Sequence, residues 1–151
     1  LLLFGLLLLV MLFHLARSEQ NRQPPELGAE GGKLAPCPQT PNCVSTQAPM
    51  AAGVNRAEPI ILQQEPQEVF RKIAEWIEGE PRAEIVEQDD DRYLHAEFRS
   101  EIFGFVDDLE VLLAQDEEKN VVHVRSASRV GKGDMGVNRK RYEKLRALVQ
   151  E

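Results

Sequence analysis

The spacing of apolar residues predicts one helix after a short first strand. An apolar run at 57–63 is typical of a strand, and Pro66 then stands where the first turn of a helix tolerates proline. From there the apolar residues recur at helical spacing along about three turns, and Gly79 is suited to cap the C-terminal end. The stripe, which we expect to lie in the core, consists of Val69, Phe70, Ile73, Trp76 and Ile77.

The rest of the chain predicts a four-stranded meander and a closing helix. Strand-like runs lie at 82–88, 92–99, 105–113 and 121–130. Polar stretches at 88–91 and 116–120 make the first and last connections hairpins. A helix over 137–150 places Val137, Tyr142, Leu145, Leu148 and Val149 on one side.

The order β-α-β-β-β-β-α indicates an α+β fold, a curved antiparallel sheet with both helices on one face. This order resembles the TATA-binding-protein-like architecture, and also a helix-grip fold that lacks its extra helices. Folds of this kind serve binders, carriers and enzymes alike, so the architecture alone does not select a function.

The N-terminal residues 1–16 are apolar on every side, which predicts a membrane segment rather than a globular helix. The run is slightly shorter than a bilayer span of about 20 residues and longer than a usual signal-peptide core. Because small residues are poorly placed for cleavage near Ala16, we favour an uncleaved anchor, while a cleaved signal stays open. The chain does not begin with Met, so we expect residues upstream. We place the folded domain on the extracytoplasmic, periplasmic side.

Residues 17–36 are rich in Pro, Gly, Glu and Gln and predict a flexible linker, so that a single domain occupies 37–151. Cys37 and Cys43 are the only cysteines, and five residues with two prolines lie between them. In an extracytoplasmic compartment such a pair favours a disulfide, which contributes about 2–3 kcal/mol in the loop-entropy picture. A metal site or a redox pair stays open, although no nearby His completes a zinc site and the spacing is not Cys-x-x-Cys.

Strand alternation separates the faces of the run at 92–99, with Leu94, Ala96 and Phe98 on one side. Tyr93, His95, Glu97 and Arg99 lie on the other side, which we expect to be solvated; His95 and His123 are expected at the surface. In the next strand Asp107 falls on the apolar side, whereas Asp108 and Glu110 share the polar side. A buried Asp107 is either a candidate acid or base with a raised pKa, or a structural residue that pairs with an arginine or caps a bulged backbone; we favour the structural role.

The last strand and helix concentrate positive charge. Residues 125–146 hold eight basic and two acidic residues, a net of +6 in a chain of net −7. Arg139, Lys140 and Arg141 lie in the opening turns of a helix, where the macrodipole disfavours cations. A glycine-rich loop with Lys132 that leads into a helix can hold a phosphate, sulfate or carboxylate. The alternative, which we favour, is an internal network with Asp107, Asp108 and Glu110.

Three separated motifs carry a family resemblance. Cys-Pro-x-x-Pro-Asn-Cys-Val-Ser at 37–45, Phe-Gly-Phe-Val-Asp-Asp at 103–108 and Arg-Ser-Ala-Ser-Arg-Val-Gly-x-x-Asp-x-Gly-x-Asn-Arg-x-Arg at 125–141 resemble the bacterial and plastid family called domain of unknown function 1499. The resemblance covers about 34–151 and implies no established activity. Members often bear N-terminal membrane segments. The shared site that it implies comprises Cys37, Asn42, Cys43, Arg99, Ser100, Asp107, Asp108, Arg125, Ser126, Ser128, Arg129, Asp134, Asn138, Arg139 and Arg141.

These observations favour a membrane-tethered binding or accessory module of the cell envelope, whose ligand is an anionic small molecule, a lipid headgroup or a protein partner. The expected ligand-binding set is Arg99, Asp107, Asp108, Arg125, Ser126, Ser128, Arg129, Lys132, Asp134, Asn138, Arg139 and Arg141. The alternative is a hydrolase with Asp107 or Asp108 as base and Arg125 or Arg129 stabilising negative charge. The sequence indicates no cofactor and no metal, and the pI near 5.1 argues against nucleic acid.

Overall fold

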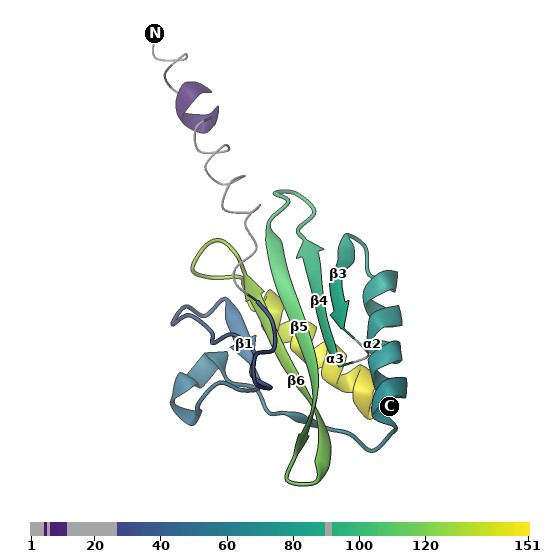
Figure 1. The fold of residues 1–151 in the computed structure, drawn as a ribbon. Coiled ribbons are helices and arrows are strands. Elements are labelled where there is room, and N and C mark those ends of the chain that lie inside the picture. Colours follow the sequence, from purple (N-terminus) through teal and green to yellow (C-terminus); the bar gives the residue numbers. More distant parts are fainter. Residues whose placement is uncertain (1–4, 6, 12–26, 90–91) are drawn as a thin grey trace.

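The structure is a computed structural model, which describes residues 5, 7–11, 27–89 and 92–151. It is an open antiparallel sheet with helices packed on one face (Figure 1). The strands are β1 (Cys43–Ser45), β2 (Ile60–Ile61), β3 (Ala83–Asp89), β4 (Tyr93–Arg99), β5 (Val106–Asp116) and β6 (Lys119–Ser128). The helices are the 3-10 helix η1 (Met50–Asn55), α2 (Pro66–Gly79) and α3 (Val137–Gln150).

The strand order is β1-β6-β5-β4-β3, and β2 also pairs with β6. The predicted α+β class and the meander from β3 to β6 are therefore confirmed. The β5–β6 hairpin turns at Glu117 and Glu118, which both adopt positive φ, as expected for a tight turn that matches the strand twist.

One strand lies where the sequence pattern did not place it. β1 has only three residues and gave no periodic signal, whereas β2 lies within the strand predicted at 57–63 and is shorter than that run. Both pair with the outer side of β6, β1 opposite Arg125–Ala127 and β2 opposite Val121 and Val122. Neither β1 nor β2 extends the meander at β3. Together they pair with the edge of β6 that does not face β5.

The main core lies between the sheet and the two helices. From α2, Phe70, Ile73 and Ile77 are fully buried, and α3 adds Tyr142 and Leu145. The sheet contributes every second residue from each central strand: Leu94 and Ala96, Leu109 and Val111, Val122 and Val124. The half-buried Trp76 packs against Phe98 with ring centroids 6.1 Å apart. The helical stripe and the strand alternation thus meet as the sequence pattern predicts.

The opposite face of the sheet, which we expected to be solvated, is largely covered. Tyr93 and His95 are buried, and His123 is buried beside Thr46, whose Oγ1 lies 3.2 Å from His123 Nδ1. The prediction that both histidines lie at the surface is wrong. Burial lowers the pKa of His123, against a smaller opposing effect of the Asp116 charge, so this imidazole is neutral at pH 7.

The cover over this face comes partly from residues 27–34, which belong to the predicted linker. Leu34 is buried and packs with Tyr93 and Leu112. The Leu34 amide donates to Gln47 Oε1 at 2.8 Å, and Gln47 Nε2 donates to the carbonyl of Gly32 at 3.0 Å. Residues 27–34, whose composition predicts a flexible linker, therefore lie against the sheet.

In the part of the chain that the structure describes, no helix combines the length and apolar character that crossing a bilayer requires. Of the predicted anchor, residues 1–4, 6 and 12–16 lie outside the described residues, as do residues 17–26 of the predicted linker.

Truncating a core side chain tests the packing of α2 on the sheet. Ile73→Ala is expected to lower the free energy of unfolding by about 2–5 kcal/mol, because Ile73 is fully buried and its loss leaves a cavity. The matched control, Ile102→Ala at an exposed position, is expected to change stability by less than about 0.5 kcal/mol. Urea denaturation followed by circular dichroism measures both, and equal effects would contradict this assignment of the core.

Candidate functional site

A buried charge network lies on the sheet face opposite the helices, at the end where β4 finishes and β5 begins. Arg129, just after β6, donates from Nε to Asp108 Oδ2 at 2.8 Å and from Nη2 to Asp108 Oδ1 at 2.6 Å. The same Nη2 reaches Glu97 Oε1 at 2.5 Å, and His95 Nε2 lies 2.8 Å from Asp108 Oδ1. Three adjacent strands thus contribute to one network.

This environment holds Asp108 in its charged form. Burial raises the pKa of the Asp108 carboxyl, but the hydrogen bonds and charges of Arg129 and His95 outweigh burial and bring the pKa below its ordinary value. A general base at neutral pH would need the opposite shift. Asp108 therefore serves here as the counterion of a buried arginine.

A second buried carboxylate, Glu110, lies two residues further along β5. Its Oε1 accepts hydrogen bonds from the Tyr93 hydroxyl at 2.9 Å and the Gly28 amide at 3.1 Å. Its Oε2 accepts from Arg125 Nη1 at 3.1 Å, while Arg125 Nε has no hydrogen-bond partner among the described residues. Burial, followed by the Glu110 charge, raises the pKa of Tyr93, so the phenol stays protonated. Residues 27–34 thus cover a carboxylate whose two oxygens both accept hydrogen bonds.

The helix face of the same strands carries a polar cluster centred on Asn138, in the first turn of α3. Asn138 Oδ1 accepts from the Ser126 hydroxyl at 2.6 Å and from Arg141 Nη1 at 2.7 Å. Asn138 Nδ2 lies within hydrogen-bond distance of three oxygens: Asn42 O at 3.1 Å, Ser128 Oγ at 2.9 Å and Asp134 Oδ2 at 2.8 Å. One buried amide thus joins β6, the cysteine loop and α3.

Asp134 occupies the N-terminus of α3. Its carboxylate accepts from the Gly136 amide at 3.0 Å and the Asn138 amide at 2.8 Å. Partial burial raises the pKa of Asp134, but these hydrogen bonds outweigh it and the net pKa is lowered. The chain's own carboxylate therefore takes the place at the helix N-terminus that the sequence left open to an external anion.

The arginines at the start of α3 are also engaged. Arg141 Nη2 donates to Asp107 Oδ2 at 2.9 Å, and the guanidinium lies 4.4 Å from the centroid of the Phe98 ring. Arg139 Nη2 donates to the carbonyls of Val54 at 2.8 Å and Arg56 at 2.5 Å. Asp107 lies on the helix side as predicted, and its expected pairing with an arginine is confirmed.

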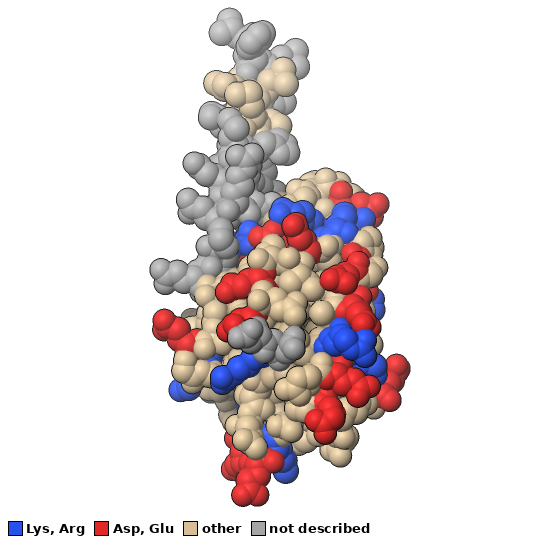
Figure 2. Space-filling view, turned by 45° about the vertical axis from the view of Figure 1, so that its right-hand side comes forward, with Lys and Arg blue, Asp and Glu red and all other residues tan. Residues whose placement is uncertain are grey.

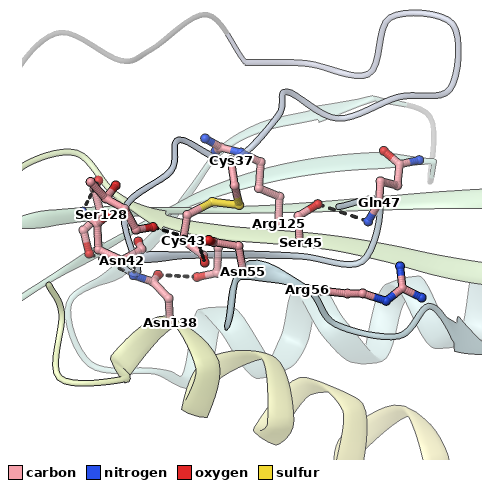
Figure 3. Close-up of a disulfide and its surroundings, with 12 residues drawn as sticks. Cys37, Asn42, Cys43, Ser45, Gln47, Asn55, Arg56, Arg125, Ser128 and Asn138 are labelled. Carbon is pink, nitrogen blue, oxygen red and sulfur yellow. Dashed lines mark hydrogen bonds between the residues drawn. A yellow bond between two sulfur atoms is a disulfide. The ribbon is translucent and has the colours of Figure 1, made fainter. Parts of the chain in front are cut away.

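The predicted disulfide between Cys37 and Cys43 is confirmed, and it closes the loop that presents Asn42 (Figure 3). The Asn42 carbonyl accepts from the Ser128 amide at 3.0 Å and from Asn138. Asn42 Nδ2 donates to Gly131 O at 3.0 Å. Arg125 lies opposite Ser45 in the register of β1 with β6. The cysteine loop is thus tied to the start of the β6–α3 loop, residues 129–136.

Strand alternation divides the predicted ligand-binding set between the two faces. The face opposite the helices receives Arg99, Asp108, Arg125 and Arg129. The helix side receives Asp107, Ser126, Ser128, Asp134, Asn138, Arg139 and Arg141. Lys132 is exposed in the β6–α3 loop. The set is therefore divided between the two faces at one end of the sheet, and most of its charges meet inside the protein.

Sequence reasoning left out three members of the buried networks, Tyr93, His95 and Glu97, whereas it expected Glu110 in an internal network. The pairing of the carboxylates with the arginines had a signal, because acidic residues alternate along β5 while arginines alternate along β6 and just beyond it. The register sets Glu110 opposite Arg125 and Asp108 opposite Ala127, two residues before Arg129. Such complementary alternation on neighbouring strands predicts cross-strand ion pairs.

Among the described residues, no three His, Cys, Asp or Glu side chains come together in a way that could hold a metal ion.

Comparison with known proteins identifies one family. The family model described as a protein of unknown function (DUF1499) matches residues 33–149. No curated protein and no solved structure matches the chain.

Neutralising Asp108 tests the buried network. Asp108→Asn is expected to lower the free energy of unfolding by about 3–5 kcal/mol, because Arg129 loses its main counterion while it stays buried. The exposed Asp89→Asn on β3 serves as the control and is expected to change stability by less than about 0.5 kcal/mol. A small effect of Asp108→Asn in urea denaturation would show that the network carries little energy.

The same carboxylate predicts an acid dependence of stability. The folded-state pKa of Asp108 lies below its ordinary value of 3.8, so its contribution is complete above about pH 4 and is lost as the pH falls through the folded pKa. Unfolding free energies measured between pH 7 and pH 2 should therefore decline below about pH 4. The difference between the unchanged chain and Asp108→Asn should shrink over that range, and a constant difference would contradict the lowered pKa.

Proposed function

The chain belongs to the DUF1499 family of proteins of unknown function, and we propose that it is a membrane-tethered binding module that takes an anionic ligand at one end of its sheet. That end is formed by the β4–β5 loop, residues 100–105, and the β6–α3 loop, residues 129–136. The tether is the apolar segment 1–16. The domain lies on the extracytoplasmic side, where its disulfide is stable.

The observation that carries this proposal is a contrast among the basic residues of 125–146. Some of them bind groups of the protein itself, whereas others are exposed to a ligand. Arg125, Arg129 and Arg141 form ion pairs with carboxylates of the sheet, and Arg139 donates to backbone carbonyls. Lys132 and Lys140, by comparison, are exposed and make no ion pair among the described residues. Lys132 lies at the tip of the β6–α3 loop, which Asn42 and Asp134 hold in place.

The attraction for an anion must be local. Acidic and basic side chains are interspersed on the face shown in Figure 2, so no broad field of one sign draws a ligand from a distance there. A fixed loop with an available ammonium group supplies a short-range contact instead.

The hydrolase alternative has no support from the network geometry. It needs a carboxylate of raised pKa in an open cleft. Asp108 is buried with a lowered pKa, and Asp107 is bound by Arg141.

Titration with inorganic phosphate tests the binding proposal. The amide resonances of residues 131–136 are expected to shift on addition of phosphate, and Lys132→Gln is expected to weaken binding by about 5- to 30-fold, because a charged hydrogen bond contributes about 1–2 kcal/mol. Nuclear magnetic resonance of the labelled chain gives the dissociation constants. Lys119→Gln, at the opposite end of β6, is the matched control and should leave the affinity unchanged. Equal affinities of all three proteins would contradict the proposed site.

A further inference from the structure

We propose that the partner of this end of the sheet is the surface of a bilayer that contains anionic lipids, into which the β4–β5 and β6–α3 loops insert apolar side chains. This inference rests on the proposed function and names the source of the anion as lipid headgroups.

The two loops expose large apolar side chains at one end of the molecule. Ile102 is 82% exposed and Phe103 66% exposed in the β4–β5 loop, and Met135 is 94% exposed in the β6–α3 loop. The loops emerge from adjacent strands, since Asp107 pairs with Ser128 and the Arg129 amide donates to the Val106 carbonyl at 3.0 Å. Both loops lie at the upper end of the view in Figure 1. Exposed apolar side chains beside a lysine are typical of surfaces that contact the interfacial region of a membrane.

The β4–β5 loop presents these side chains in a fixed shape. Ser100 closes it, because its amide donates to the Phe105 carbonyl at 2.9 Å and its hydroxyl accepts from the Phe105 amide at 2.9 Å. Gly104 turns the chain with φ +61° and donates to the Ser100 carbonyl. The Phe103 and Phe105 rings stack with centroids 5.4 Å apart. Burying Ile102 and Phe103 in a membrane therefore costs little additional conformational entropy.

The distribution of charge favours contact with the membrane through one end of the domain. The opposite end of the sheet is the β5–β6 hairpin, where Asp116, Glu117 and Glu118 outnumber Lys119 and which an anionic surface repels. The loop end holds Lys132, and its two acids are engaged: Glu101 lies 3.8 Å from Arg82 in an ion pair, and Asp134 accepts from the Gly136 and Asn138 amides. An anionic bilayer thus favours the loop end over the hairpin end.

The length of the connection keeps the loops near the bilayer. Ten residues, 17–26, separate the apolar segment from Leu27. At full extension they span at most about 35 Å, which is comparable to the size of the domain itself. A domain held this close meets the surface at high effective concentration, so a contact of three apolar side chains and one lysine needs less affinity of its own.

Tryptophan quenching by brominated lipids tests the inference. Phe103→Trp, Met135→Trp and the control Ile61→Trp are prepared in the full chain; Ile61 is exposed on β2, close to the hairpin end. Each protein is mixed with vesicles of phosphatidylcholine and phosphatidylglycerol, with or without bromine on the acyl chains. The emission of the unchanged chain, which comes from Trp76 alone, is subtracted.

We expect the emission added at positions 103 and 135 to shift to shorter wavelength and to be quenched by brominated lipid, while the emission added at position 61 is not. Replacing phosphatidylglycerol by phosphatidylcholine, or adding Lys132→Gln, should reduce the quenching. Equal quenching at all three positions, or none at positions 103 and 135, would overturn the inference.

The outcomes also separate this inference from the proposed function. If the chain does not sediment with vesicles, the membrane tether fails, and the proposed function fails with it. If the chain sediments without quenching at positions 103 and 135 while the Lys132-dependent phosphate shifts persist, the loops bind a soluble anion and only the membrane surface is excluded.

Discussion

The pairing of β5 with β6 is the constraint on which the rest of the structure depends. Glu110 lies opposite Arg125, and Asp108 reaches Arg129 two positions further along. A slip of one residue would turn both carboxylates toward the apolar core beneath the helices and remove both partners. The buried ion pairs therefore define the register of the two longest strands, and the other strands assemble against this hairpin. These buried ion pairs contribute to the specificity of the fold as much as to its net stability.

Most of the fold could be predicted from the sequence because its elements are long and periodic. The α2 stripe from Val69 to Ile77 and the alternation along β4 each locate an apolar face without further information. β1 and η1 could not be predicted in this way, because a strand of three residues has no period and η1 is short and irregular. The burial of His95 and Tyr93 escaped prediction for a different reason. Part of their cover, residues 27–34, has the composition of a linker, and its order depends on contacts such as that between Gly28 and Glu110.

The candidate site was only partly predictable, since a linear motif does not reveal on which face each residue lies. The run from Arg125 to Arg129 alternates across the sheet, so its arginines face one way and its serines the other. The unfavourable position of Arg139 and Arg141 near the start of α3 has a local explanation. Asp134 supplies the negative charge that the helix terminus prefers, while Arg141 serves Asp107 and Arg139 serves two carbonyls of the preceding chain.

The strand order ends at β3 on one side of the sheet, and the sequence of this edge strand bears on how copies of the protein behave as neighbours. Glu84, Glu87 and Asp89 are exposed along this strand, and the pairing with β4 shifts register between Ile85 and Glu87. Repeated acids and a local irregularity make poor templates for a further strand. An edge that repels its own copies lets the molecules come close together at high local concentration without joining their sheets into a continuous aggregate.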